Sequence, residues 1–157
     1  IEKCSNYAVA HELVGRVHLL GGRPEAADKH FAAAIGHAPR FVRGHYHMGL
    51  SALSQRKHAR AIESLSNAIR LEPAHQGALL ARGQANLLHG QHEQAIVDLK
   101  TITAADNTHA LAWFLLGGTY EAAGKPEERL AAFCQAASLG HKASKALCAE
   151  MQGATEP

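Results

Sequence analysis

Twelve histidines are the residues of this chain best suited to chemistry, because imidazole binds metals and transfers protons near neutral pH. A helical metal site usually presents two ligands four residues apart, on one face of the helix. His45 and His47 are two residues apart, and the His-Glu pairs that begin at His11 and His92 have no second histidine four residues later. The spacing therefore predicts no metal site and no cofactor, and favours surface or turn histidines.

Other catalytic patterns are equally incomplete. The stretch "GTYEAAGKP" differs from a phosphate-binding loop because its first glycine comes one position too early and Pro126 replaces the required serine or threonine. Cys4, Cys134 and Cys148 are odd in number and unmatched in spacing, which predicts reduced, buried thiols and not a disulfide framework. No serine, histidine and aspartate form a recognisable constellation. We therefore expect the chain not to be an enzyme.

Composition narrows the class of partner. The chain has 157 residues, of which 46% are hydrophobic and 19% charged, enough apolar content for one folded domain. The net charge of +2 is dispersed, so we expect no nucleic-acid partner. The longest strongly apolar stretch, residues 110–116, is far shorter than the ~20 residues of a membrane-spanning helix, so we expect no membrane insertion. The start at Ile1 is typical of an excised piece, and the compartment is left open with the cytoplasm as default.

A fixed interval of 34 residues organises the whole chain. Glycines recur at this interval, large apolar residues follow each glycine after sixteen residues, and alanines fill two further columns. The glycine and large columns are Gly15, Gly49, Gly83 and Gly117, and Phe31, Leu65, Leu99 and Phe133. Self-similarity at a fixed period is the mark of a stacked repeat architecture. A glycine inside a helix costs roughly 1 kcal/mol relative to alanine, so we expect these glycines to face the alanine column, where two helix backbones approach closely.

Each repeat is predicted to contain two helices separated by a turn. Gly124 and Pro126 form one such turn, since glycine tolerates the closing conformation of a helix and proline suits the first turn of the next. The expected helices lie near 5–20, 24–37, 41–55, 58–71, 75–88, 92–104, 109–122, 126–139 and 141–152. The predicted fold is an all-α, right-handed α-solenoid forming a single domain over 1–157, with repeats at about 8–41, 42–75, 76–109 and 110–143 and a capping helix and tail at 144–157.

These columns resemble the tetratricopeptide repeat family. "WFLLGGTY" at 113–120 fits the first half of the family motif with Trp113, Leu116, Gly117 and Tyr120. Ala27, Phe31, Ala34 and Pro39 fit its second half in the first repeat. Arg82, Arg129, Asn107 and His141 depart from the motif, which affects the third and fourth repeats most. The resemblance implies a protein-interaction scaffold or adaptor.

In the family, first-helix residues line a concave binding face. Carrying those positions over gives a partner-binding set that is largely apolar with a few charges: Arg16, Arg43, Tyr46, Leu50, Leu80, Gln84, Leu88, Leu111 and Phe114. We expect this groove to take a partner helix or extended peptide, with its arginines meeting acidic flanks. In co-chaperones of the family a lysine and an asparagine bind a terminal carboxylate, whereas here Glu12 and Arg16 hold those positions. We therefore expect no such clamp.

Two other roles stay open. Exposed apolar residues would support self-association into a structural scaffold, because head-to-tail contacts need not close. Alternatively, the repeats would form an accessory arm that presents substrate to a larger enzyme.

Overall fold

The computed structural model describes residues 2–153, with side chains from residue 6 onward, and this part of the chain consists of α-helices without a strand. The predicted all-α class is confirmed. The helices are α1 (Glu2–Leu20), α2 (Pro24–His37), α3 (Val42–Ser54), α4 (His58–Leu71), α5 (Gln76–Leu88), α6 (His92–Ala105), α7 (Ala110–Ala122), α8 (Pro126–Ser138) and α9 (Lys142–Gly153). Residues 154–157, part of the predicted tail, lie outside the described residues.

The 34-residue interval of the sequence reappears in the positions of the helices. The even-numbered helices α2, α4, α6 and α8 begin at residues 24, 58, 92 and 126, and α3, α5 and α7 begin at residues 42, 76 and 110. Each start is 34 residues after the previous one. The two prolines at residues 24 and 126 occupy the first helical position, where a missing N–H costs nothing.

The turn inside each helix pair repeats one backbone conformation. Residues 22, 56, 90 and 124 all have positive φ, between 56° and 80°. In the first pair, the amide of Gly22 donates to Leu19 O and that of Arg23 to His18 O, and the same two bonds recur in the other three pairs. This is the left-handed ending that glycine favours. Arg56 adopts it without being glycine, so the turn geometry is retained where the sequence signal for it is lost.

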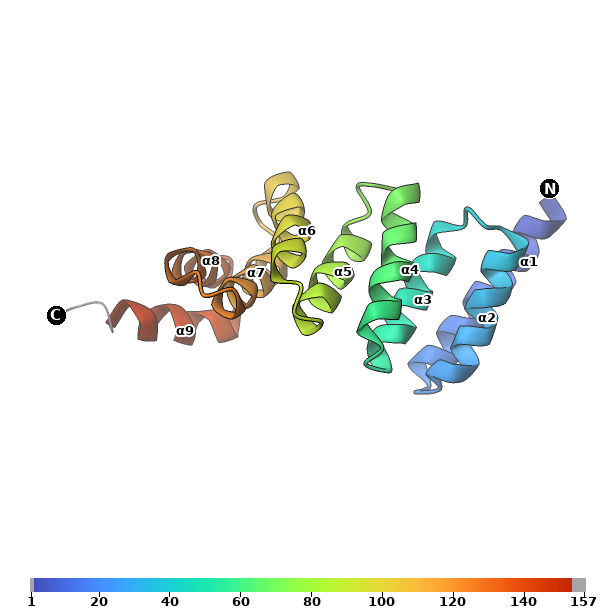
Figure 1. Ribbon diagram of the computed structural model, residues 1–157, viewed down its shortest axis with the longest axis horizontal. Coiled ribbons are helices and arrows are strands. Elements are labelled where there is room, and N and C mark those ends of the chain that lie inside the picture. The colour runs from blue at the N-terminus through green and yellow to red at the C-terminus, as the bar shows by residue number, and fades with distance from the viewer. Residues whose placement is uncertain (1, 154–157) are drawn as a thin grey trace. The chain divides into compact units, whose positions relative to one another are not determined.

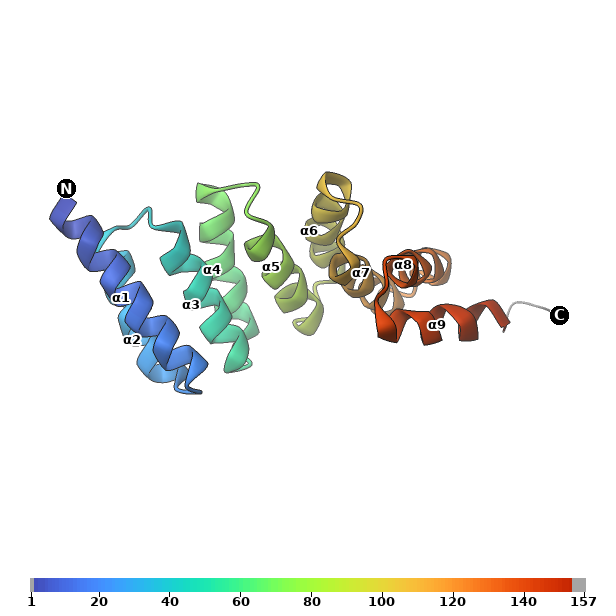
Figure 2. The same cartoon turned by 180° about the vertical axis from the view of Figure 1, so that it is seen from behind.

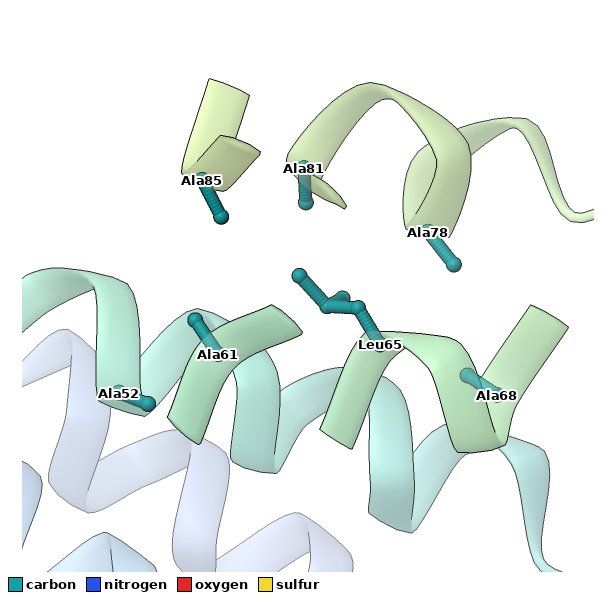
Figure 3. Close-up of a cluster of buried hydrophobic side chains, with 7 residues drawn as sticks. All are labelled: Ala52, Ala61, Leu65, Ala68, Ala78, Ala81 and Ala85. Atoms are coloured by element: carbon teal, nitrogen blue, oxygen red, sulfur yellow. The ribbon is translucent and has the colours of Figure 1, made fainter. Parts of the chain in front are cut away.

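The chain divides into two compact units, unit 1 (Ile1–Ala85) and unit 2 (Asn86–Pro157). In unit 1, α1 packs on α2 and α3 on α4, and both α1 and α2 contact α3 (Figures 1 and 2). Leu65 is the large member of a buried cluster otherwise made of alanines, shown in Figure 3: Ala52, Ala61, Ala68, Ala78, Ala81 and Ala85. Alanines let the helices approach closely, and Leu65 fills the space that remains.

Unit 2 is built in the same manner. Helix α7 packs against α6 and α8, and α9 packs against α8. Leu99, Ile102, Leu116 and Phe133 are among its large buried residues, and Ala95, Ala112, Ala132 and Ala136 are buried as well. The large column predicted from the sequence is therefore buried in both units.

The predicted partner of the glycine column is wrong. A Cβ placed on Gly15 would lie 2.5 Å from Phe31 Cε1, one on Gly49 would lie 2.5 Å from Leu65 Cγ, and one on Gly117 would lie 2.6 Å from Phe133 Cδ1. The nearest neighbours of these three glycines thus belong to the large column, in place of the predicted alanines. They make room for a bulky side chain of the second helix, which gives a different physical reason for the 34-residue recurrence of glycine.

The prediction of reduced cysteines is also wrong for two of the three. Cys134 of α8 and Cys148 of α9 form a disulfide, with their Cα atoms 5.0 Å apart. The chain between them includes the turn that folds α9 back on α8, and this packing brings the two sulfurs together, although the cysteines are 14 positions apart in the sequence. Cys4 lies outside the residues whose side chains the structure describes.

Candidate functional site

The first helices of unit 1 hold a buried carboxylate between cationic side chains. Glu12 of α1 is fully buried, and Arg43 Nη2 of α3 donates to its Oε2 at 2.8 Å. His47 Nε2 lies 3.0 Å from Glu12 Oε1, and Arg16 Nη1 lies 3.7 Å from the same oxygen. A buried carboxylate is tolerated only when it is paired and hydrogen-bonded. We call these four residues the Glu12 cluster.

The Glu12 cluster carries a net positive charge at neutral pH. Burial lowers the pKa of His47 below its ordinary value, and Arg16, Arg43 and His75 lower it further, whereas Glu12 raises it. His47 is therefore neutral at pH 7, and two guanidiniums share one carboxylate. The side chains of Arg16 and Arg43 are 43% and 48% exposed, so unused N–H donors of both reach solvent. Such a site can bind an anionic group.

In unit 1, most apolar residues of the predicted partner-binding set pack inside the unit. Tyr46 and Leu50 are partly buried and pack against the Leu65 cluster. The Tyr46 ring also contacts His47 and His75, with ring centroids 5.0 and 4.8 Å apart. Leu80 is partly buried, and Gln84 is exposed. The surface that unit 1 offers beside the Glu12 cluster is therefore aromatic and polar.

In unit 2 the predicted set is more open. Leu88 at the end of α5 is 54% exposed and Leu111 of α7 is 44% exposed. Phe114 is partly buried, because its ring stacks on His141 at 4.3 Å and lies 5.9 Å from the Phe133 ring. Leu88 and Leu111 are thus free to contact a partner, while Phe114 contributes one face to the packing of α7 on α8.

Unit 2 also has two hollows that are lined by other residues. One, of about 510 Å³, is lined by the turn before α6 and by the end of α7, and the other, of about 130 Å³, lies at the turn between α7 and α8. Lys125 and Glu93, which form an ion pair at 2.8 Å, each line one of them. Neither hollow contains a residue of the predicted set.

Within the described part of the chain, no group of three or more histidine, cysteine, aspartate or glutamate side chains could hold a metal ion. The described helices also include none long and apolar enough to cross a membrane.

The sequence pattern missed the pairing inside the Glu12 cluster. It identified Glu12 only as a replacement at a carboxylate-clamp position, but Glu12 is buried and paired with arginine. Arg43 and His47 follow Glu12 by 31 and 35 residues, close to one repeat length. Charged residues of opposite sign spaced near the repeat length are the signal that could have found this cluster.

Two family models match the sequence, both described as tetratricopeptide repeat, over residues 46–107 and 110–139. No curated protein matches the chain significantly.

Solved structures share the fold at low sequence identity. MamA from Desulfovibrio magneticus RS-1, from residue 41 to its end, superposes with a TM-score of 0.81 at 21% identity, covering 96% of this chain and 98% of that one. YrrB, described as a TPR protein with an unusual peptide-binding site, gives 0.82 at 22% identity, covering 91% and 74%. The second TPR domain of human RPAP3, solved with the HSP70 peptide SGPTIEEVD, gives 0.71 at 19% identity, covering 74% and 97%.

Proposed function

The chain belongs to the tetratricopeptide repeat family, and from this premise we propose that it is a protein-interaction module that binds an acidic segment of a partner protein. YrrB and the RPAP3 domain, which share its fold, are described with a peptide-binding site and a bound peptide. The observation that carries the proposal is the Glu12 cluster, in which two half-exposed arginines share one buried carboxylate. The module is proposed to be non-enzymatic.

The arrangement of the cluster favours a carboxylate on the partner. Glu12 holds the Arg43 guanidinium in place through one hydrogen bond, so less side-chain entropy is lost when a ligand binds. Carboxylates accept the paired N–H donors of arginine with good geometry. Tyr46 lies between His47 and His75, in contact with both rings, and offers aromatic surface to the residues that flank the acidic side chain. Leu88 and Leu111 offer unit 2 an apolar contact of its own.

We propose that the partner's acidic residue lies within its chain and not at its C-terminus. A clamp for a terminal carboxylate uses several uncommitted donors, whereas here Arg43 is already bonded to Glu12 and the neutral His47 lies against the same carboxylate. One net positive charge is left to attract a ligand, which suits a single side-chain carboxylate.

Fluorescence anisotropy with labelled helical peptides tests the function. We expect a peptide with glutamates between leucines to bind more tightly than its glutamine counterpart, and amidation of its C-terminus to leave affinity unchanged. Arg16→Gln should weaken binding about tenfold, because it removes a charge-assisted hydrogen bond. Arg16 is the variant of choice, since its 3.7 Å contact with Glu12 is long and its loss should cost little stability.

Arg70→Gln is the matched control, because Arg70 is an exposed cation of the same unit whose described contact is Asn67. It removes the same charge and should leave affinity unchanged. Equal loss of affinity in both variants would show that only the net charge of the protein matters, and it would contradict the proposed site. A requirement for the free C-terminal carboxylate would replace the proposal with a clamp.

A second candidate function is self-association, and the outward surface of α1 favours it. Val17 and Leu20 are 63% and 86% exposed, and Tyr7, Leu13 and Val14 are exposed beside them. Exposed apolar residues gathered on one helix mark interaction sites. Sedimentation across a hundredfold range of concentration distinguishes the candidates, since a monomer throughout would remove this one.

A further inference from the structure

Four histidines interdigitate along the contact between α1 and α2. His11 and His18 come from α1, and His30 and His37 come from α2. The rings of His11 and His30 are 5.4 Å apart, those of His11 and His37 are 5.6 Å apart, and those of His18 and His30 are 5.3 Å apart. We call this row the histidine seam. It involves none of the residues of the Glu12 cluster.

The sequence places the histidines of the seam in two pairs, and the packing of the two helices brings the pairs together. His11 and His18 are seven residues apart on α1, as are His30 and His37 on α2, so each pair lies on one face of its helix. Because α1 and α2 form an antiparallel pair, the two faces meet with the rings alternating. At later repeats the positions equivalent to His18 and His30 hold residues such as Ala52 and Ser64, which are buried. The imidazoles of His18 and His30 are therefore absent from the second repeat, which cannot form the same row.

At the centre of the seam two ring nitrogens approach closely. His11 Nδ1 and His30 Nδ1 are 3.1 Å apart. In the metal-free protein, the N–H of one ring donates a hydrogen bond to the nitrogen of the other. Two nitrogens bound at ~2.0–2.1 Å to one ion, with an angle between right-angled and tetrahedral, lie roughly 2.9–3.4 Å apart. The observed separation falls within this range, so the two nitrogens are already close enough to bind one ion once the rings tilt to aim both lone pairs at it.

The surroundings of this nitrogen pair suit a metal ion. Both rings are partly exposed, which allows an ion to enter and water to complete its coordination. His18 Nδ1, on the other side of His30, is buried and has no hydrogen-bond partner among the described residues. Neutral imidazole suits zinc, nickel and copper ions, while magnesium prefers oxygen ligands.

We propose that His11 and His30 form a binding site for a divalent transition-metal ion of the zinc, nickel and copper class. The two ligands come from different helices of one pair, so the ion joins α1 to α2. A site of two protein ligands differs from the clusters of three or more that the described residues lack. Metal bound here stabilises the first repeat, because it binds the folded form in preference to the unfolded chain.

Isothermal titration of untagged protein with ZnCl₂ or NiCl₂ at pH 7.5 tests the proposal. We expect one saturable site per chain for each ion, a higher melting temperature with metal, and no heat with MgCl₂. His11→Gln and His30→Gln should each lower affinity at least about tenfold, since even indirect metal partners cost tenfold or more when lost. His45→Gln is the matched control, because His45 is the repeat equivalent of His11 and bonds to Pro39 O instead. Equal loss in this control would overturn the site.

A second measurement uses the unaltered protein, so it does not depend on the variants folding. Substoichiometric CuCl₂ broadens the NMR signals of histidine rings close to the bound ion. We expect the ring signals of His11 and His30 to broaden first, followed by those of His18. Broadening that begins at histidines outside the seam, or at all twelve together, would overturn the proposal.

Discussion

Gly117 and Gly118 are adjacent residues of α7 with opposite surroundings. A Cβ on Gly117 would lie 2.6 Å from the Phe133 ring, whereas a Cβ on Gly118 would meet nothing within 4 Å. Phe133 is almost fully buried between its neighbours, so it has little room to move. The two glycines therefore differ in what they contribute, although both reduce the intrinsic helix propensity of the same segment.

We expect Gly117→Ala to destabilise the protein by about 1–3 kcal/mol, because the added methyl group overpacks the core. Gly118→Ala should stabilise it by about 0.5–1 kcal/mol, because alanine restricts the unfolded chain and favours the helix. Urea denaturation followed by circular dichroism measures both changes. Each variant serves as the control for the other, and a shift in the same direction for both would contradict the packing found for Phe133.

At the scale of the elements, the helices followed from local signals and the contacts between them did not. The predicted ranges 24–37 and 58–71 coincide with α2 and α4, because prolines, glycines and the repeat register mark helix ends. Across different helices, the Glu12 cluster and the histidine seam join residues 12 to 35 positions apart, and their formation depends on how α1 lies against α2 and α3. Periodicity predicts which residues share a helix face, but it does not specify which polar groups meet across two helices.

The disulfide is another contact between two helices that the sequence pattern did not predict, and it leads to a prediction about α9. Among the described helices α9 packs against α8, and the Cys134–Cys148 bond closes this contact. Breaking the bond should destabilise the docking of α9 by about 3 kcal/mol, the loop-closure value for a loop of this length. Hydrogen exchange measured with and without reductant should show faster exchange in residues 142–153 after reduction.

The double variant Cys134→Ala and Cys148→Ala is the control for this experiment. It lacks the bond from the start, so reductant should leave its exchange unchanged. Equal protection of α9 in the oxidised and reduced protein would show that packing alone holds the helix.

At the scale of the whole molecule, histidine makes the charge unusually sensitive to acid. The net charge is +2 with neutral histidines, and protonation of all twelve would add twelve positive charges while the carboxylates stay ionised. A histidine is ordinarily half protonated near pH 6.5. Self-repulsion at high net charge destabilises a compact state. We therefore expect a modest acidification below neutral pH to lower the stability of the whole fold.

His47 also makes the folded protein less stable as the pH falls. Burial lowers its pKa in the folded protein, despite the opposing effect of Glu12, and Arg16, Arg43 and His75 face it with like charge. Between the lowered pKa and the ordinary value of about 6.5, the unfolded chain binds more protons than the folded one, so stability falls as pH falls. The stabilisation is fully present above about pH 6.5 and is lost below it.

We therefore expect the melting temperature to decrease steadily from pH 7 to pH 5.5 in differential scanning calorimetry. His47→Gln should lessen this decrease, whereas His89→Gln, which alters an exposed histidine, should remove only its share of the net charge. Adding 0.5 M NaCl screens repulsion between exposed charges but leaves the burial of His47 unchanged. In high salt, the unaltered protein should therefore keep part of its pH dependence. The His47→Gln variant should keep less of it. A melting temperature that stays constant or rises on acidification would show that the His47 imidazolium gains more from Glu12 than it loses by burial.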